Sequence, residues 1–242
     1  MKNVSALRRQ NKLLASLPAN DWATLQPHFE LVPMAKREVL HKAGVALKYV
    51  HFPIFGMVSL VSHMRDGASA ELAVIGHEGV VGVCAFLGDD RAHSDAVEQG
   101  AGQGLRIPAA VIADLAGSSH GIVRPVLRYA QSLFVHMGQT AACNRHHGLD
   151  QQLCRWLLLN LDRTRDNKLL ATQEQIAGML GVRREGVTSG ALKLQKAGII
   201  HYVRGRISIL NRKGLEQRSC ECYSVVKRAY EHLPGVAAFA TG

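Results

Sequence analysis

Charged and hydroxyl side chains gather between residues 183 and 193 with the spacing of one helix face. Apolar residues recur among them at i, i+4 and i+7, which turns the polar side chains toward the opposite face of the predicted helix. A guanidinium can donate two hydrogen bonds to guanine, a carboxylate can accept one from cytosine, and hydroxyl and ammonium groups bind phosphates. The segment therefore has the chemistry to read duplex DNA. Its candidate residues are Arg183, Arg184, Glu185, Thr188, Ser189 and Lys193.

The preceding residues predict how this face is positioned. Thr172 can cap a first helix, and Gly181 follows where the chain must turn sharply with φ > 0. The two predicted helices then have the register of a helix-turn-helix, and we add Thr172 and Gln173 to the DNA-binding candidates. The alternative is an ordinary helical hairpin with a solvated charged face. The apolar positions are Ile176, Ala177 and Leu180 in the first helix and Val187, Ala191 and Leu194 in the second.

Two glycines depart from this pattern. Gly186 and Gly190 lie inside the second helix, where each costs about 1 kcal/mol relative to Ala. Either tertiary packing supports that helix, or it becomes rigid only on DNA.

A basic hairpin is predicted after the second helix. Short β-branched runs at 201–203 and 207–210 flank Arg204, Gly205 and Arg206, the pattern of two strands joined by a tight turn. Arg204 and Arg206 are predicted phosphate contacts, and a solvated basic turn is the alternative. Together the segments predict a winged helix-turn-helix.

The charge of the chain indicates a polyanionic partner. The 242 residues carry a formal net charge of +10. From residue 150 onward there are 15 Lys and Arg against 8 Asp and Glu, whereas residues 1–149 hold 14 against 11. Double-stranded DNA fits this excess. An anionic membrane surface is the electrostatic alternative, but no basic amphipathic helix with exposed aromatic residues supports it. Without a signal peptide or a long apolar run, the expected location is the cytoplasm.

Five scattered cysteines predict free thiols. Cys220 and Cys222 form the one close pair, and no second cluster along the sequence completes a zinc or iron–sulfur site. We therefore predict no metal site, favour a structural or incidental role for the pair, and leave that role open.

The rest of the chain predicts an α+β protein in three parts. Residues 1–121 hold N-terminal helices followed by short β-rich runs with glycine turns, which favours an antiparallel jelly-roll barrel. Residues 122–145 form a long central helix, and residues 146–242 contain a further helix, a charged linker at 163–168 and the winged unit. The apolar stripe of the central helix is wide enough for a homodimer seam, with simple packing on the barrel as the alternative. The stripe comprises Val126, Leu127, Ala130, Leu133, Phe134, Met137 and Ala141.

This order of parts resembles the Crp/Fnr family of bacterial transcriptional regulators. The resemblance covers almost the full length and is carried by residues 172–210 and by the barrel stretch 76–82, GHEGVVG. The ending at 220–226 is similar to a subgroup with no well-defined effector. The resemblance implies that Arg184 and Glu185 meet bases, that Ser189 stands where family members often have Arg, and that RNA polymerase is a partner of an activator.

The same resemblance locates an effector pocket and makes cyclic AMP doubtful there. In cyclic-nucleotide-binding members a Gly-Glu step holds the ribose and an Arg-Ser step the phosphate; here Gly82-Val83 and His93-Ser94 align with them. Val83 cannot bond a ribose hydroxyl, and His93 is a weaker phosphate partner than Arg. Arg91 could face the pocket by strand alternation. Iron–sulfur sensing by an N-terminal cysteine cluster is not expected, because no Cys precedes residue 84, so the effector stays unknown.

The sequence gives less support to two other classes of function. A non-DNA ligand sensor or scaffold acting through protein contacts is the alternative, against which the basic C-terminal part argues. An enzyme is not expected, because the sequence contains no P-loop, no G-x-S-x-G, no H-E-x-x-H and no carboxylate pair at catalytic spacing.

Overall fold

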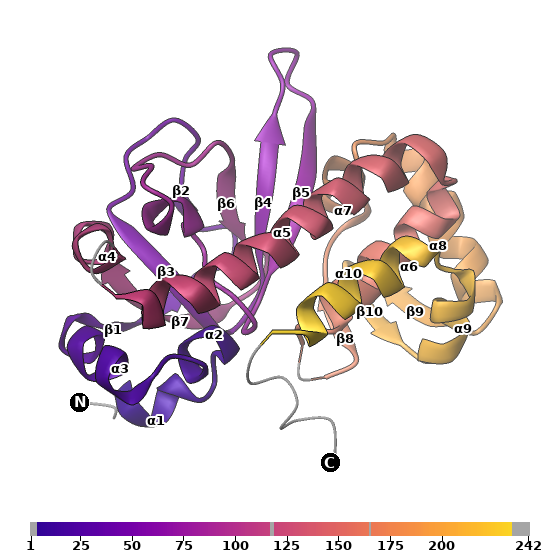
Figure 1. Ribbon diagram of the computed structural model, residues 1–242. Helices are drawn as coiled ribbons and strands as arrows, with labels where there is room; N and C mark the ends of the chain where they lie inside the picture. Colours follow the sequence, from indigo (N-terminus) through magenta and orange to yellow (C-terminus); the bar gives the residue numbers. More distant parts are fainter. Residues whose placement is uncertain (1–3, 117–118, 165, 234–242) are drawn as a thin grey trace.

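The computed structural model describes residues 4–116, 119–164 and 166–233. The predicted domain ranges also include 1–3, 117–118, 165 and 234–242, which lie outside the described residues. A β-rich part and a mainly helical part lie side by side, and the long helix α5 runs from one to the other (Figure 1). No helix of the described residues is long and apolar enough to cross a membrane.

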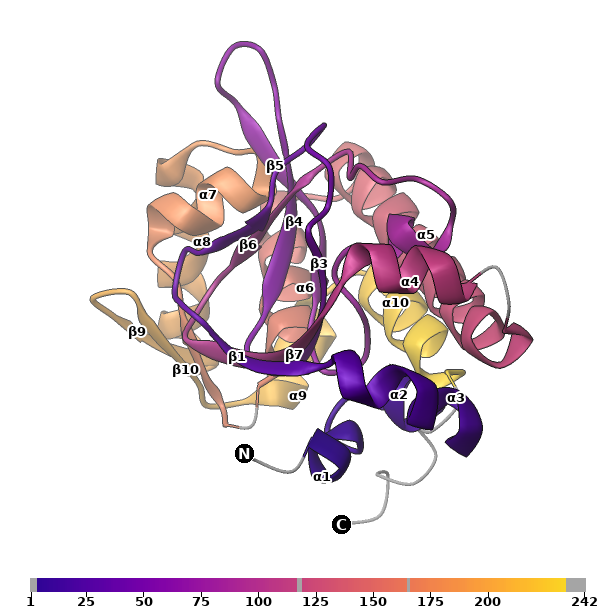
Figure 2. The same cartoon turned by 90° about the vertical axis from the view of Figure 1, so that its left-hand side faces the viewer.

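The β-rich part is an antiparallel two-sheet barrel, as predicted. One sheet has the strand order β1-β7-β3 and the other β2-β6-β4-β5, and Figure 2 shows them enclosing a common interior. Side chains such as Leu105 and Ile107 alternate inward along β7 and are fully buried. The strands are β1 (Glu30–Met34), β2 (Val39–His41), β3 (Tyr49–Phe55), β4 (Val58–His63), β5 (Ser69–Ile75), β6 (Asp95–Glu98) and β7 (Gly102–Pro108).

Short helices flank the barrel. The chain enters through three of them and leaves through α4; one 3-10 turn joins α3 to β1, and the other lies between β5 and β6. They are α1 (Val4–Arg8), α2 (Lys12–Ala15), α3 (Ala19–Leu25), η1 (Gln26–His28), η2 (Val83–Phe86) and α4 (Ala109–Ala116).

The long helix α5 (His120–His146) packs one face tightly on the barrel. Tyr129 is fully buried there, and its hydroxyl donates to the carbonyl of Val80 over 3.1 Å. A Cβ at Gly79 would lie 2.1 Å from the Tyr129 ring. Only glycine therefore allows this approach of the barrel turn to the helix.

The helical part begins with α6 (Leu149–Leu161), which is almost wholly buried. A small sheet of order β8-β10-β9 forms its wing. The remaining elements are β8 (Lys168–Leu170), α7 (Gln173–Leu180), α8 (Arg184–Lys196), β9 (Ile200–Val203), β10 (Arg206–Ile209), α9 (Arg212–Arg218) and α10 (Glu221–Glu231).

The prediction of a charged linker at 163–168 is wrong at both ends. Lys168 begins strand β8, and Arg163 is buried, with its Nε 2.7 Å from Glu78 Oε1 of the barrel. The Arg163 guanidinium also lies over the Tyr230 ring of α10 at 5.3 Å. The sequence suggested a solvated charge at Arg163, but this residue forms the buried ion pair that joins the barrel to the helical part. We call this Glu78–Arg163 pair the ionic joint.

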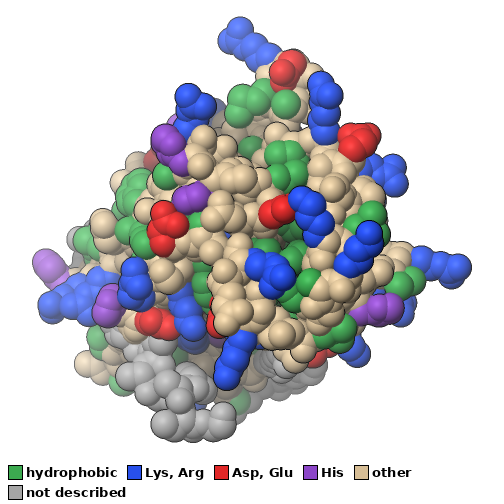
Figure 3. Space-filling view, turned by 90° about the vertical axis from the view of Figure 1, so that its right-hand side faces the viewer, with side chains coloured by type: hydrophobic (Ala, Val, Ile, Leu, Met, Phe, Trp, Pro, Cys, Tyr) green, Lys and Arg blue, Asp and Glu red, His purple; other side chains and the backbone are tan. Residues whose placement is uncertain are grey.

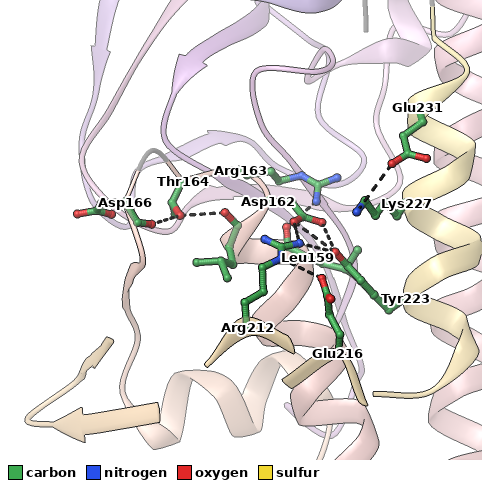
Figure 4. Close-up of polar contacts among 11 residues, drawn as sticks. Leu159, Asp162, Arg163, Thr164, Asp166, Arg212, Glu216, Tyr223, Lys227 and Glu231 are labelled. Carbon is green, nitrogen blue, oxygen red and sulfur yellow. Dashed lines mark hydrogen bonds and ion pairs between the residues drawn. The ribbon is translucent and has the colours of Figure 1, made fainter. Parts of the chain in front are cut away.

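The end of α6 is tied to α9 and α10 as well. Figure 4 shows Arg212 and Tyr223 converging on Asp162. The Tyr223 hydroxyl donates to Asp162 Oδ2 over 3.0 Å, and Arg212 forms an ion pair with the same carboxylate. These contacts hold the C-terminal helix against the rest of the helical part.

Candidate functional site

The predicted helix-turn-helix is present, and its first helix begins at the predicted cap. Thr172 Oγ1 accepts from the backbone NH of Gln175, and the Gln175 side chain accepts in return from the Thr172 NH. This reciprocal arrangement satisfies two NH groups that a helix start leaves unpaired. Gly181 closes the helix with φ 66°, in the left-handed region. The turn therefore needs the glycine that the sequence places there.

The two glycines of α8 are explained by tertiary packing. A Cβ at Gly186 would lie 2.5 Å from Leu149 of α6, and one at Gly190 would lie 3.1 Å from Leu153. Helix α8 therefore lies against α6 at a separation that larger residues would prevent. This observation favours tertiary support over a helix that becomes rigid only on DNA.

The outer face of α8 is exposed over most of the predicted residues. Arg183, Arg184, Glu185, Ser189 and Lys193 are all exposed. Among the described residues, no ion pair uses Arg183 or Arg184, whereas Lys193 pairs with Asp150 at 2.8 Å. Figure 3 shows Lys and Arg side chains projecting from many points of the molecule's helical end.

Two predicted residues bond to one another instead of standing free. The half-buried Thr188 donates to the Gln173 side chain over 2.7 Å and to the Arg184 carbonyl over 3.0 Å. Thr188 thus fixes the Gln173 amide beside the start of α7, and the exposed cap residue Thr172 lies next to it.

The wing also forms as predicted. Arg204 and Gly205 occupy its tip with φ of 50° and 77°, the left-handed geometry of a two-residue hairpin turn. Arg204 and Arg206 are exposed, and the Tyr202 hydroxyl donates to the Ala171 carbonyl over 2.7 Å. The wing is therefore fixed beside α7 with its two guanidinium groups in solvent.

Helix α5 divides the predicted dimer residues between two faces. Val126, Ala130 and Leu133 are buried, and Met137 is half-buried. In contrast, Leu127 and Phe134 are 51% and 65% exposed, and Ala141 is exposed too. One side of the stripe therefore packs on the barrel, and the other side is open to solvent.

A cavity of about 220 Å³ lies at the position predicted for the effector pocket. It lies between the barrel and α5, and four of the five predicted residues line it: Gly82, Val83, His93 and Ser94. Its other lining residues are His41, Leu60, Leu72, Ile75, Val80, Cys84, Leu87, Ala92, Ala130, Leu133, Phe134 and Met137. The wall is therefore almost wholly apolar.

No Lys or Arg of the described residues lines this pocket. The predicted residue Arg91 points elsewhere, with its guanidinium bonded to the Gly44 carbonyl and close to Asp90. The His93 side chain is 92% exposed and faces Asp89. His41 contributes two ring nitrogens without a hydrogen-bond partner, and burial lowers the pKa of its imidazole. The pocket can thus offer a neutral imidazole, but no cation for a phosphate.

The sequence analysis missed a cluster of four side chains of the types that can bind a metal ion. Cys143 and His147 at the end of α5 meet Cys220 and Cys222 at the start of α10, with all four donor atoms within 4.8 Å of one another. The expectation that the cysteine pair lacks further donors is wrong. The i, i+4 spacing of Cys143 and His147 on a helix was the signal that could have pointed to it.

Two domain families match the chain. Residues 31–119 match the cyclic nucleotide-binding domain, and residues 151–218 match the Crp-like helix-turn-helix domain. No curated protein matches the chain in sequence.

Solved structures show the same fold. A putative transcriptional regulator of the Crp/Fnr family from Eubacterium rectale has a TM-score of 0.69 at 18% identity, covering 86% of this chain and 97% of that one. FixK2 from Bradyrhizobium japonicum has a TM-score of 0.66 at 16% identity, covering 79% and 98%. The c-di-GMP responsive global regulator CLP of Xanthomonas campestris has a TM-score of 0.61 at 16% identity, covering 79% and 99%.

A barrel, a long helix and a Crp-like helix-turn-helix with an exposed basic face together define a DNA-binding transcription regulator. The chain combines a cyclic nucleotide-binding domain with a Crp-like helix-turn-helix domain, and its fold is that of solved Crp/Fnr family regulators. Regulators with this helix-turn-helix bind DNA and typically act as dimers.

Proposed function

We propose that two copies of the chain pair through α5 and place their two α8 helices in successive major grooves of a pseudo-palindromic DNA site. In this proposal residues 1–121 are the sensory barrel, 122–145 the dimer helix and 146–242 the DNA-binding domain. The single observation that carries the proposal is the exposed Arg183–Arg184 step at the start of α8, which forms no ion pair with any residue that the structure describes. An activator of this type would also contact RNA polymerase.

The open face of α5 supports the pairing. Leu127, Phe134 and Ala141 follow one another at intervals of seven residues and are all exposed. Gly138 lies on the same line, and a Cβ there would have nothing within 4 Å. A seven-residue repeat is the spacing by which two helices pack along a shared seam, and a glycine lets the partner approach closely. A second copy of α5 fits this face.

The residues of α8 have separate roles in the proposed complex. Arg184 would donate two hydrogen bonds to guanine O6 and N7, and Glu185 would accept one from cytosine N4. Arg183, Lys193, Thr172 and the wing would contact phosphates, which position the protein without reading sequence. Arg204 and Arg206 serve in the wing, Gln173 and Thr188 hold the helix start, and Ser189 faces the groove.

The apolar pocket would take a small, mainly apolar effector. Its occupant would touch both the barrel and α5, including Phe134, which is also part of the proposed dimer seam. Such a ligand would shift the population between two arrangements of the paired helices. Cyclic AMP is not expected to do so, because no Lys or Arg among the described lining residues faces its phosphate.

The experiment begins with selection of binding sites from a random duplex library by the full-length protein. Fluorescence anisotropy then measures affinity for the selected duplex and for an unrelated one, in a series of salt concentrations. Arg184→Ala should cost about 1–3 kcal/mol per half-site and relax the preference for one G·C pair. Arg204→Ala should weaken both duplexes alike and reduce the salt slope by about 1.

Arg91→Ala is the matched control, because it removes one exposed arginine from the barrel and should leave both affinities unchanged. Equal losses of Arg184→Ala on both duplexes would refute base reading, and an absence of salt-dependent binding would refute DNA binding itself. Titrations with cyclic AMP and cyclic di-GMP complete the test, the second because it is the signal named for one structural neighbour. An increase in affinity with either nucleotide would contradict the apolar effector.

A further inference from the structure

The four donors at the junction of α5 and α10 lie close enough together to bind a single metal ion. Cys143 Sγ lies 3.5 Å from Cys220 Sγ, and Cys222 Sγ lies 3.5 Å from His147 Nδ1. One zinc ion with bonds of about 2.3 Å to sulfur and about 2.0 Å to nitrogen separates its ligands by about 3.5–3.8 Å. These two separations are close to those that one central ion requires, and all four donor atoms lie within 4.8 Å of one another.

The kind of donor selects the metal. Three thiols and one imidazole are soft and borderline ligands, and a tetrahedral set of this composition is typical of a structural zinc site. The three cysteines are buried, with exposures of 0%, 5% and 2%, and pack together apart from the main core. A closed set of four protein ligands leaves no position for a substrate or a water molecule. These features favour a structural over a catalytic ion.

The surroundings of the cluster complete a metal site. His147 directs Nδ1 to Cys222, and its Nε2 lies 3.4 Å from Glu221 Oε1. A carboxylate on the far nitrogen is the partner that orients metal-bound histidines in proteins. The Gln152 side chain donates to the His147 carbonyl over 2.8 Å and so holds the end of α5.

A buried cation also lies close to the cluster. Arg155 of α6 is 3% exposed, forms no ion pair with a described residue, and leaves its Nε without a hydrogen-bond partner. Its Nη1 donates to Thr140 Oγ1 over 3.1 Å, and Thr140 precedes the ligand Cys143 by three residues in α5. Three thiolates and one divalent ion carry a net charge of −1, and a buried arginine compensates such a charge.

We propose that Cys143, His147, Cys220 and Cys222 bind one zinc ion. The ion fastens the start of α10 to the end of the dimer helix α5. Because α10 also holds Asp162 of α6 through Tyr223, the metal fixes the DNA-binding domain relative to the dimer helix. Binding releases the thiol protons, so affinity falls at low pH. The site is independent of the proposed DNA contacts.

Metal content of the full-length protein is the first test. The protein is purified with reductant and without chelator, dialysed, and assayed for zinc, iron and sulfide. The result expected is one zinc per chain and neither iron nor sulfide. Cobalt added to the chelator-stripped, reduced protein should give the intense visible absorption of tetrahedral cobalt with thiolate ligands, and one equivalent of zinc should abolish it. This measurement uses the unaltered chain, so a variant that fails to fold does not affect it.

Variants then assign the ligands. Cys222→Ser and His147→Gln should lose stoichiometric zinc and the cobalt spectrum, whereas Cys84→Ser, which removes a thiol from the barrel pocket, should retain both. Glu221→Gln should weaken zinc about 10- to 100-fold in competition with a chromophoric chelator, because it removes the carboxylate on His147. Zinc should raise the unfolding midpoint of the wild type and of Cys84→Ser, but not that of Cys222→Ser or His147→Gln.

Three outcomes would overturn the proposal. The first is reduced wild-type protein that contains no zinc and gives no cobalt spectrum. The second is iron together with sulfide at these residues. That result would indicate an iron–sulfur cluster, which contains several metal ions, and not a site for one zinc ion. The third is zinc that remains stoichiometric in both Cys222→Ser and His147→Gln, since the ion would then be elsewhere.

Discussion

Removing the charge of Glu78 tests the ionic joint between the barrel and the DNA-binding domain. Glu78 and Arg163 have side-chain exposures of 7% and 5%, and their closest atoms are 2.7 Å apart. Burial opposes ionisation of Glu78, but the attraction of Arg163 outweighs it and holds the pKa of the carboxyl below its usual 4.5. In Glu78→Gln the guanidinium keeps its bond to the Leu159 carbonyl but loses its counter-charge.

The expected loss follows from burial. Leaving one charge of a buried pair without its partner costs about 3–5 kcal/mol, whereas an exposed pair contributes about 1 kcal/mol or less. The chain contains a matched exposed pair, Lys193 with Asp150, at 2.8 Å and with exposures of 64% and 56%. The two pairs have almost the same length, so burial is what separates their expected energies. We expect Glu78→Gln to lose about 3–5 kcal/mol of unfolding free energy and Asp150→Asn about 1 kcal/mol or less.

Urea unfolding followed by circular dichroism measures both variants, at one protein concentration because a dimer's stability depends on it. The double variant Glu78→Gln/Arg163→Met should recover part of the loss, since it removes the unpaired charge. The lowered pKa means that the contribution of Glu78 is present above pH 4.5 and is lost as the pH falls below it. The wild type and Glu78→Gln should therefore converge in acid. A loss no larger than that of Asp150→Asn, or a pH-independent difference, would refute the reasoning.

Two further predictions concern the dimer and the pH range. Phe134→Asp places a carboxylate on the exposed face of α5 in both copies, and it should weaken dimerisation roughly 1000-fold as measured by sedimentation equilibrium. The control Met64→Asp, on the exposed β4–β5 turn, should leave the dimer unchanged. An unchanged dimer in Phe134→Asp would contradict the proposed seam. Burial raises the pKa of Glu98 to about 7, and its Oε2 has no hydrogen-bond partner in the described part of the chain. Because the pKa is raised, the contribution of Glu98 to stability is present below pH 4.5 and is lost as the pH rises through about 7. At about pH 8 the free energy of unfolding of Glu98→Gln should therefore exceed that of the wild type by about 1–3 kcal/mol. Equal slopes of stability against pH for both proteins would show that Glu98 is not the group responsible.

Much of this molecule can be predicted from its sequence because the signals are local. The cap at Thr172, the positive φ at Gly181 and the wing turn at Gly205 each depend on the conformation of a few adjacent residues. The apolar positions of α7 and α8 follow helical spacing, which decides their inner and outer faces together. Alternation and glycine turns likewise indicate the barrel strands. Periodicity and turn chemistry therefore predicted the architecture and the exposed polar face of α8.

Contacts between residues far apart in the sequence determined the features that the sequence analysis did not predict. In the sequence Gly186 and Gly190 only lower the predicted stability of a helix. In the structure they allow α8 to pack closely against α6. Strand alternation predicted that the Arg91 side chain could face the pocket. In the structure its guanidinium donates a hydrogen bond to the Gly44 carbonyl and points away from the pocket. Arg163 reads as a linker charge because its partner lies 85 residues earlier in the chain.

The cysteine cluster is the clearest case. Each half is short in sequence, Cys143 with His147 and Cys220 with Cys222, and neither half can close a tetrahedral site. Only the packing of α10 against the end of α5 brings the four donors within reach of one ion. The sequence determined the elements and their faces because these depend on neighbours along the chain. The tertiary structure alone decided which distant side chains meet, because that depends on how the elements pack.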